Sequence, residues 1–374
     1  MHTHFSFVLL RDGITAAHLS TFLALSKTQG LWSRTIGETT TYCVDSMIAI
    51  MCLAVSVIYS GILGDVATPL LTQAGLSNRH NSRATNILAI TLTLLLPMSL
   101  VKNLSALAFT SILGFSAILY TVFFILVRAL DGSYTIGSGK FVTDGVLELL
   151  PTFQKSTVWN CDFTSLILTA NMSLAYIANY NAPSFYRELK DTSNERFRKM
   201  VVISFGLLVI LYVITMAAGY STFGDACQGN ILLNCHPDDI LSNLGRVATW
   251  FSILFGFPLV MSGAREGLIG TASSMGLPQL GSDRNHFGLV ASLLALVTII
   301  SCFVEDVSLV VGLTGAAMGS FIVYLCPAII YTKAVALAMG TDSLDYKRAR
   351  INLAMVPFGI LLGGFGVYMT LKGV

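Results

Sequence analysis

The sequence has few charged residues: only 11% of its 374 residues are Asp, Glu, Lys or Arg, whereas 54% are apolar. A soluble globular domain carries about 25% charged residues, and a single soluble core of this size has no room for so many apolar side chains. The same figures exclude disordered, coiled-coil, collagen-like and small disulfide-stabilised proteins. The net charge of +2 gives no sign of nucleic-acid binding. The composition therefore indicates a helical protein that crosses a membrane many times.

Enzyme signatures and a signal peptide are also missing. The chain has no Gly-x-Ser-x-Gly, His-Glu-x-x-His or phosphate-loop motif, and no His/Cys spacing typical of a metal site. We therefore expect no enzyme activity and no bound cofactor or metal. The first short apolar run is followed at once by Arg11 and Asp12, which does not fit a cleavable signal peptide. With no linker in the chain, residues 1–374 are expected to form one transmembrane domain.

Long apolar runs predict about ten transmembrane helices. The hydrocarbon core of a bilayer is about 30 Å thick and needs roughly 20 apolar residues in each helix. The runs lack the alternation of a β-barrel strand, so the expected fold is all-α and polytopic. Arg11, Asp12 and His18 interrupt the first run, and Pro97 should kink or tilt the third. The expected spans are 5–25, 43–63, 86–101, 104–128, 163–180, 200–224, 244–264, 286–304, 307–332 and 352–371.

Basic residues are distributed unequally between alternate loops, and this predicts the orientation. One set of loops holds fourteen Lys and Arg residues, including Arg196, whereas the opposite set holds seven, including Lys140. Cytoplasmic loops are enriched in Lys and Arg, so the richer set is expected to be cytosolic. Both ends of the chain then lie on the non-cytosolic side.

Three of the seven cysteines, Cys161, Cys227 and Cys235, lie outside the predicted spans, in two loops on the non-cytosolic side. If that compartment is oxidising, a disulfide among the three is expected. A bond between Cys227 and Cys235 would close a short loop, and Cys161 bonded to either would join the two loops. The alternative is three free thiols, and the sequence leaves these pairings open.

The fifth predicted span is unusually polar. Asn171, Ser173, Tyr176 and Asn179 lie in its central and cytosolic parts. They could form hydrogen bonds between helices. Alternatively, the helix unwinds there and presents backbone groups to a substrate, because broken backbone is tolerated at membrane depth only where it lines a cavity. A neutral, hydrogen-bonding pocket of this kind suits a zwitterion. These four residues are therefore candidate substrate-binding residues.

Two other spans contain small residues or proline at informative positions. Gly312, Gly315 and Gly319 of the ninth span are spaced three and four apart, which places them on one face of a regular helix. We expect close packing against another backbone there, with sliding during transport as the alternative. In the seventh span, Gly256-Phe257-Pro258 predicts a kink. In an exterior loop, Asp238-Asp239 predicts a turn.

Four motifs in order along the chain resemble the amino acid/auxin permease family, a group of eukaryotic transporters that includes neutral, vacuolar and proton-coupled amino acid carriers. The motifs are Asn181 to Lys190, with Tyr186-x-Glu188-Leu189; Gly219 to Gly224, followed by Asn230-Ile-Leu and Asp239-Ile-Leu; Phe257-Pro258-Leu259 with Arg265; and Gly315 to Pro327 with Tyr331. The resemblance as a whole covers nearly the whole chain. The resemblance implies a secondary transporter that moves amino acids, chiefly neutral ones, across a membrane by alternating access.

The family is similar in fold to the bacterial leucine transporter, in which five helices are followed by an inverted five-helix repeat. Substrate binds midway, between unwound parts of the first and sixth helices, with the third and eighth helices as walls. Carried over to this chain, the resemblance implies that the sixth helix unwinds near residues 173–179. It adds Ser56 and Tyr59 from the third helix, and Ser252 and Gly256 from the eighth, to the candidate substrate-binding residues. The implied membrane is the plasma membrane or a vacuolar or lysosomal membrane.

Two departures from the family change what the resemblance implies. The family's first helix is absent, so the chain resembles an N-terminally truncated member and is expected to be inactive or leaky by itself. The alternative is a non-transporting or sensor-like protein of the same fold. Sodium-coupled members carry a hydroxyl just before the proline of the eighth helix, where this chain has Phe255-Gly256-Phe257. This disfavours Na+ coupling and favours H+ coupling or facilitation, but no titratable pocket residue identifies the coupling ion.

Overall fold

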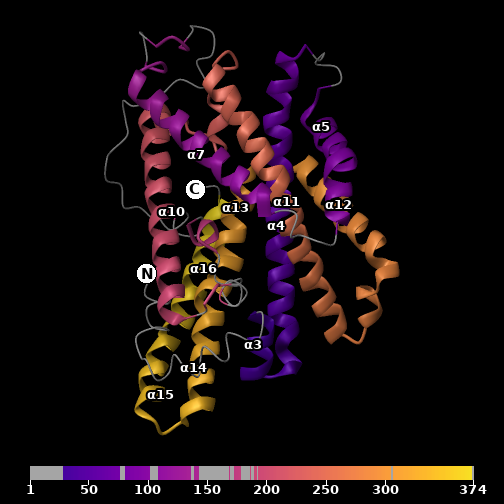
Figure 1. Cartoon of the computed structure of the whole chain (residues 1–374), viewed down its shortest axis with the longest axis vertical. Coiled ribbons are helices and arrows are strands. Elements are labelled where there is room, and N and C mark those ends of the chain that lie inside the picture. The colour runs from indigo at the N-terminus through magenta and orange to yellow at the C-terminus, as the bar shows by residue number, and fades with distance from the viewer. Residues whose placement is uncertain are drawn as a thin grey trace.

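The computed structural model consists of helices and connecting turns, with no strand in the described part of the chain. α4 (Thr41–Gln73) runs through the centre of the view in Figure 1, α12 (His286–Phe303) lies on one side of it, and α10 (Asn194–Phe223) lies on the other. α7 (Ala108–Asp131) crosses the upper part of the bundle obliquely. The residues that the structure describes are 28–75, 81–101, 108–135, 139–142, 168, 172–177, 186, 189–191, 193–304 and 306–372.

Eight helical segments are long and apolar enough to cross a membrane, and each coincides with one of the predicted spans. The prediction of an all-α polytopic membrane protein is confirmed. The expected span 5–25 and most of 163–180 lie outside the described residues, so the total of ten helices stays a prediction. The eight segments are Glu38–Gln73, Arg83–Leu100, Ile112–Asp131, Asn194–Phe223, Ile240–Ser274, Asp283–Phe303, Val307–Met339 and Leu344–Lys372.

α4 and α11 (Ile240–Ser274) are the two longest helices of the described chain, and they form its most extensive helix pair. α11 also packs on α7, and α12 packs on α4. α10 packs on α7. The remaining helices are α3 (Thr28–Thr35), α5 (Arg83–Ile90), α6 (Leu96–Leu100), α13 (Val307–Thr314), α14 (Cys326–Met339), α15 (Leu344–Ala349) and α16 (Met355–Lys372).

A row of glycines brings α11 close to α4. A Cβ atom added to Gly267 would lie 2.7 Å from the backbone oxygen of Asp45 and 2.9 Å from the backbone nitrogen of Ala49. Close backbone approach through small residues is the usual way in which membrane helices gain van der Waals contact, since lipid gives them no hydrophobic drive to associate. The two helices run antiparallel, because Gly256, Gly263, Gly267 and Gly270 of α11 face Tyr59, Cys52, Ala49 and Asp45 of α4, respectively.

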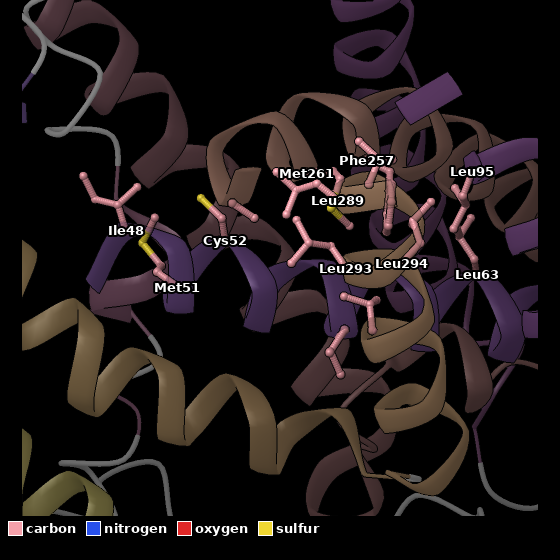
Figure 2. Packing of buried hydrophobic residues seen from close by; sticks show 14 of the residues in the cluster. Ile48, Met51, Cys52, Leu63, Leu95, Phe257, Met261, Leu289, Leu293 and Leu294 are labelled. Carbon is pink, nitrogen blue, oxygen red and sulfur yellow. The ribbon is translucent and has the colours of Figure 1, made fainter. Parts of the chain in front are cut away.

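The main hydrophobic core lies where α4, α11 and α12 meet (Figure 2). Phe257 of α11 is fully buried there, together with Leu63 of α4 and Leu294 of α12. Leu95, from a π-helical turn between α5 and α6, belongs to the same cluster. These contacts hold α11 and α12 against α4 through dense dispersion contacts. The same core therefore fixes the positions of α4 and α11 side chains at mid-depth.

Two of the π-helical turns end two residues before a proline. η2 (Thr91–Leu95) precedes Pro97 at the start of α6, and η12 (Phe321–Leu325) precedes Pro327 at the start of α14. Proline lacks an N–H group, and its ring clashes with the carbonyl four residues earlier. A widened turn accommodates both effects without ending the helix. The predicted irregularity at Pro97 thus takes the form of a π turn, whereas α11 continues as an α-helix through Pro258.

The glycines of the ninth predicted span pack closely, as expected, but against different segments. A Cβ on Gly312 would lie 2.7 Å from the Thr370 side chain of α16, whereas one on Gly319 would lie 3.1 Å from Ser173. The π-helical turn η11 (Gly315–Gly319) separates them. A π turn holds more residues than an α turn, so the spacing that predicted one shared face does not apply here.

Replacing Gly267 with Ala is expected to destabilise the protein by about 1–3 kcal/mol, the usual cost of overpacking. The added methyl group would meet backbone atoms of α4, which cannot move aside as a flexible side chain can. Gly206→Ala on α10 is the matched control, because Gly206 faces open space and both substitutions gain the same helix propensity. The measurement is thermal unfolding of each variant in detergent; equal melting temperatures would contradict the close α4–α11 contact.

Candidate functional site

A helix ends at Ala175, inside the fifth predicted span. Residues 172–175 are helical, Tyr176 lies in a turn and Ile177 is not helical. The N–H of Tyr176 still donates to the Met172 carbonyl at 3.0 Å, but the N–H of Ile177 donates to the Leu174 carbonyl at 3.1 Å, which tightens the last turn. This end falls within the stretch that the family resemblance implied to be unwound. Asn171 and Asn179, two of the predicted site residues, lie outside the described residues.

α10 holds this helix end through one tyrosine. The hydroxyl of Tyr212 donates a hydrogen bond to the Ala175 carbonyl at 3.2 Å. The Tyr212 ring also packs edge-on against Tyr176, with 5.1 Å between ring centroids, and Phe205 stacks on Tyr176 at 6.2 Å. Nothing in the sequence pattern indicated Tyr212, because its partners are more than thirty residues away along the chain.

Two of the predicted site residues from α4 and α11 do come together. The position that a Cβ atom would take on Gly256 lies 3.6 Å from the Tyr59 ring. Tyr59 and Ile177 both pack against the main hydrophobic core. The 172–177 segment, which Tyr212 holds, and the Tyr59–Gly256 contact therefore border the same core.

The three predicted serines have packing or helix-internal roles. The Ser56 hydroxyl donates to the Cys52 carbonyl of its own helix at 2.8 Å, and the Ser252 hydroxyl donates to the Gly114 carbonyl of α7 at 3.3 Å. Ser173 is buried, and its Cβ lies against Gly319.

The chemistry of this region is neutral. Tyr59, Tyr176, Tyr212 and Gly256 offer hydroxyl groups, aromatic faces and backbone, without a charged side chain among them. No cluster of His, Cys, Asp or Glu that could hold a metal ion occurs in the described part of the chain. Such a surface can form hydrogen bonds to a small polar molecule and pack against its apolar part.

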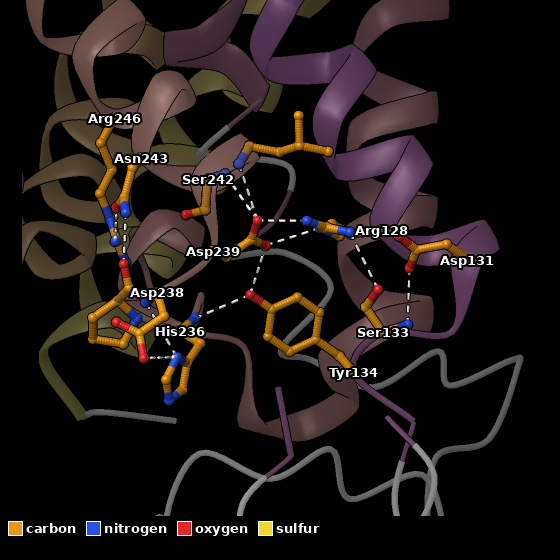
Figure 3. A network of polar contacts seen from close by, with 12 residues as sticks. Arg128, Asp131, Ser133, Tyr134, His236, Asp238, Asp239, Ser242, Asn243 and Arg246 are labelled. Atoms are coloured by element: carbon orange, nitrogen blue, oxygen red, sulfur yellow. Dashed lines mark hydrogen bonds and ion pairs between the residues drawn. The ribbon is translucent and has the colours of Figure 1, made fainter. Parts of the chain in front are cut away.

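A second polar cluster closes one end of the bundle, on the side that the sequence predicts to be non-cytosolic (Figure 3). Asp239 is fully buried and accepts two hydrogen bonds from the Arg128 guanidinium, at 2.6 and 2.8 Å. The same carboxylate caps the start of α11 by accepting the N–H of Leu241 at 3.0 Å. It also accepts a hydrogen bond from the Tyr134 hydroxyl at 3.0 Å. The loop before α11 is thereby fixed to the end of α7.

Arg246 of α11 binds the same loop through hydrogen bonds. This buried guanidinium donates to the carbonyls of Leu232 and Cys235, at 2.9 and 2.6 Å, and to the Asn243 side chain at 2.6 Å. The sequence predicted a turn at Asp238-Asp239 and gave no special role to Arg246. Both residues instead organise the loop, which could be recognised only from contacts between α7, the loop and α11.

The predicted disulfide between Cys227 and Cys235 is not formed in the structure. Cys235 is a buried free thiol that lies 3.8 Å from the Ile231 carbonyl. The Cys227 sulfur lies 3.6 Å from the Gly219 carbonyl. Hydrogen bonds around Asp239 and Arg246 therefore fix this loop without a bond between these two cysteines. Cys161 lies outside the described residues.

A helical chain that crosses a membrane repeatedly, and that ends a helix inside one of its apolar spans, is built as secondary transporters are. This chain is a multi-pass membrane protein and belongs to the transmembrane amino acid transporter family, whose profile matches residues 16–372.

Similar proteins include both long and short members of this family. The rat protein "Solute carrier family 38 member 10" is 26% identical over 314 residues, covering 77% of this chain and 26% of that protein. The fission yeast Schizosaccharomyces pombe "Vacuolar amino acid transporter 5" is 23% identical over 291 residues, covering 77% and 65%. The Danio rerio "Sodium-coupled neutral amino acid symporter 2" is 25% identical over 289 residues, covering 71% and 55%. The match thus spans about a quarter to two thirds of the length of these relatives.

The Asp239 cluster should respond to mutation and to acid. Replacing Asp239 with Asn leaves Arg128 without its buried partner, for which a cost of about 3–5 kcal/mol is expected. Burial raises the pKa of Asp239, but the hydrogen bonds from Arg128 and Tyr134 outweigh it, so the pKa lies below the usual 3.8. The stabilisation is therefore complete above the unfolded-state pKa, near 3.9, and is lost as pH falls through the lower folded-state value.

Thermal unfolding of wild type and Asp239→Asn between pH 7 and pH 3 measures this effect. The two melting temperatures should differ widely at pH 7 and converge only in the most acidic samples. Asp238→Asn is the control, because the neighbouring Asp238 side chain is 85% exposed. If both substitutions lower the melting temperature equally at pH 7, Asp239 does not have the role assigned to it.

Proposed function

We propose that this chain forms the transmembrane domain of a secondary transporter that moves neutral amino acids across a membrane by alternating access. Membership of the transmembrane amino acid transporter family supports this assignment. So do the names of relatives, two of which are a "Vacuolar amino acid transporter" and a "Sodium-coupled neutral amino acid symporter". The observation that carries the proposal is the helix end at Ala175, which the Tyr212 hydroxyl holds and which is followed by Ile177 packed on the same core as Tyr59.

Gly256 is the glycine of this row at which α11 approaches α4 least closely. At Gly263, Gly267 and Gly270, an added Cβ would lie within 3.0 Å of an α4 atom, so no space is available there. At Gly256 the nearest atom is 3.6 Å away and belongs to the ring of Tyr59, which is an ordinary van der Waals distance. Of these four glycines, Gly256 is therefore the one beside which an added atom would not clash with α4.

The neutral surroundings favour a substrate with no net charge. The carboxylate and ammonium groups of a zwitterion can bond to the backbone groups at a helix break and to tyrosine hydroxyls. A substrate with an ionised side chain would need a partner for that charge, because burying an unpaired charge is costly. The tyrosine rings offer apolar contact area to a neutral side chain instead.

The packing of α4 and α11 supports an alternating-access mechanism. They are long, antiparallel and closely packed, and α5 and α12 both pack on α4. An antiparallel pair of matched helices is what an inverted repeat produces at its centre. In this mechanism α4 and α11 stay together, while the segment bearing residues 172–177 moves relative to them and exposes the site to each side in turn.

Uptake of labelled amino acids by the full-length protein in cells lacking their own carriers tests the proposal. Wild type should accumulate neutral amino acids in preference to acidic or basic ones. Gly256→Leu should abolish uptake while leaving the amount of protein in the membrane unchanged, because the leucine side chain would occupy the space beside Tyr59. Gly206→Leu on α10, at a glycine with open space around it, should retain uptake. Equal uptake by both variants would place the substrate elsewhere.

We further propose that transport does not require sodium. Between Trp250 and Pro258, Ser252 carries the only hydroxyl of α11, and it donates to the Gly114 carbonyl. The position that provides a sodium ligand in sodium-coupled relatives is thus occupied by apolar residues. Uptake by wild type should persist when choline replaces sodium in the buffer. A loss of more than about 90% of uptake on that replacement would show that sodium binds through other residues.

A further inference from the structure

Tyr212 connects α10 to the broken helix, and the two parts of its side chain make different contacts. Its ring packs edge-on against Tyr176, with 5.1 Å between centroids. Its hydroxyl donates to the Ala175 carbonyl at 3.2 Å. The hydroxyl can therefore be removed by a Phe substitution that leaves the ring contact in place.

The hydroxyl supplies a hydrogen-bond donor to a carbonyl at the end of a helix. The last four carbonyls of an α-helix have no N–H partner within the helix. At membrane depth there is no bulk water to replace that partner, so an unsatisfied carbonyl is tolerated only in a water-filled or protein-lined site. Ala175 is the last helical residue before the turn at Tyr176. The Tyr212 hydroxyl thus stabilises this particular end point of the helix over a longer or shorter one.

The position of this bond connects it to the candidate substrate site. Ile177, two residues after Ala175, packs against the core that α4, α11 and α12 share, and so does Tyr59, whose ring faces Gly256. The backbone that follows Ala175 is therefore held beside the α4–α11 pair, with a bond from a third helix at its start. If the helix ended one residue earlier or later, the backbone groups at this place would change.

We propose that Tyr212 is a positioning residue for substrate binding: its hydroxyl fixes the helix end at Ala175 in the arrangement that binds substrate. This inference rests on the proposed function. Without the hydroxyl, the helix end is distributed among several arrangements, and only a fraction of the molecules is competent to bind. The apparent dissociation constant rises in inverse proportion to that fraction. Saturating substrate restores the competent arrangement, so the maximal rate is preserved.

The experiment compares Tyr212→Phe with Tyr120→Phe in the full-length protein. Tyr120 of α7 makes the same kind of bond, from its hydroxyl to the Leu241 carbonyl at 3.2 Å, but at the end of the bundle near Asp239. Both substitutions remove one hydroxyl-to-carbonyl hydrogen bond between helices. Tyr212→Phe should raise the KM for uptake by about 3- to 20-fold, the range expected for one such bond in a membrane protein. Tyr120→Phe should leave KM unchanged, and both variants should retain the wild-type maximal rate per molecule.

Hydrogen–deuterium exchange supplies a readout that does not depend on transport. Tyr212→Phe should speed exchange in the peptide containing residues 172–177, whereas Tyr120→Phe should not. If wild type takes up no amino acid, the proposed function fails, and the exchange measurement still decides whether Tyr212 positions the helix end. Unchanged KM and exchange in Tyr212→Phe would overturn the inference. So would a Tyr212→Phe protein that fails to fold while Tyr120→Phe folds, because the hydroxyl would then be structural.

Discussion

The close contact between α4 and α11 is the constraint on which the rest of the structure depends. Lipid gives no hydrophobic drive for helices to associate, so the pair relies on van der Waals contact, and that contact requires glycines where the backbones meet. At Gly267 the backbone of α4 lies within 3 Å of where a side chain would begin. With this distance fixed, the large side chains of α12, such as Leu294, fill the adjacent core. The place of Tyr59 opposite Gly256 follows from the same contact.

The irregular parts of the chain are held by specific polar contacts. Near the start of α11, one buried carboxylate, Asp239, caps the helix and pairs with Arg128. Because this pairing lowers the pKa of Asp239, the carboxylate remains ionised and paired at mildly acidic pH. At the broken helix, the Tyr212 hydroxyl satisfies the exposed Ala175 carbonyl. In both places a helix terminus receives the partner that its own backbone lacks.

Sequence reasoning predicted the features that depend on local composition. The length of the apolar runs alone located the eight long apolar helices that the structure describes. A bilayer requires that length of every helix that crosses it, whatever the helix packs against. Tyr59 and Gly256 were predicted through the family resemblance, and they do lie together. Tyr212, Asp239 and Arg246 were missed because their importance arises from partners on other helices. The prediction that Gly312 and Gly319 share one helix face was wrong, because the π turn that begins at Gly315 changes the helical period. Neither long-range contacts nor π turns leave a periodic signal in the sequence.

The unequal strength of these contacts indicates where the molecule can move. The α4–α11 pair is joined along several turns by backbone-close packing and by a shared buried core, so separating its halves would open a large void. The 172–177 segment contacts α10 through the Tyr212 hydroxyl bond and two aromatic contacts, η11 through Ser173 against Gly319, and the edge of the main core through Ile177. Single polar and aromatic contacts can be exchanged for others at small cost, whereas a dense core cannot. In the alternating-access mechanism proposed above, the 172–177 segment is therefore the part that shifts, while the α4–α11 pair stays intact.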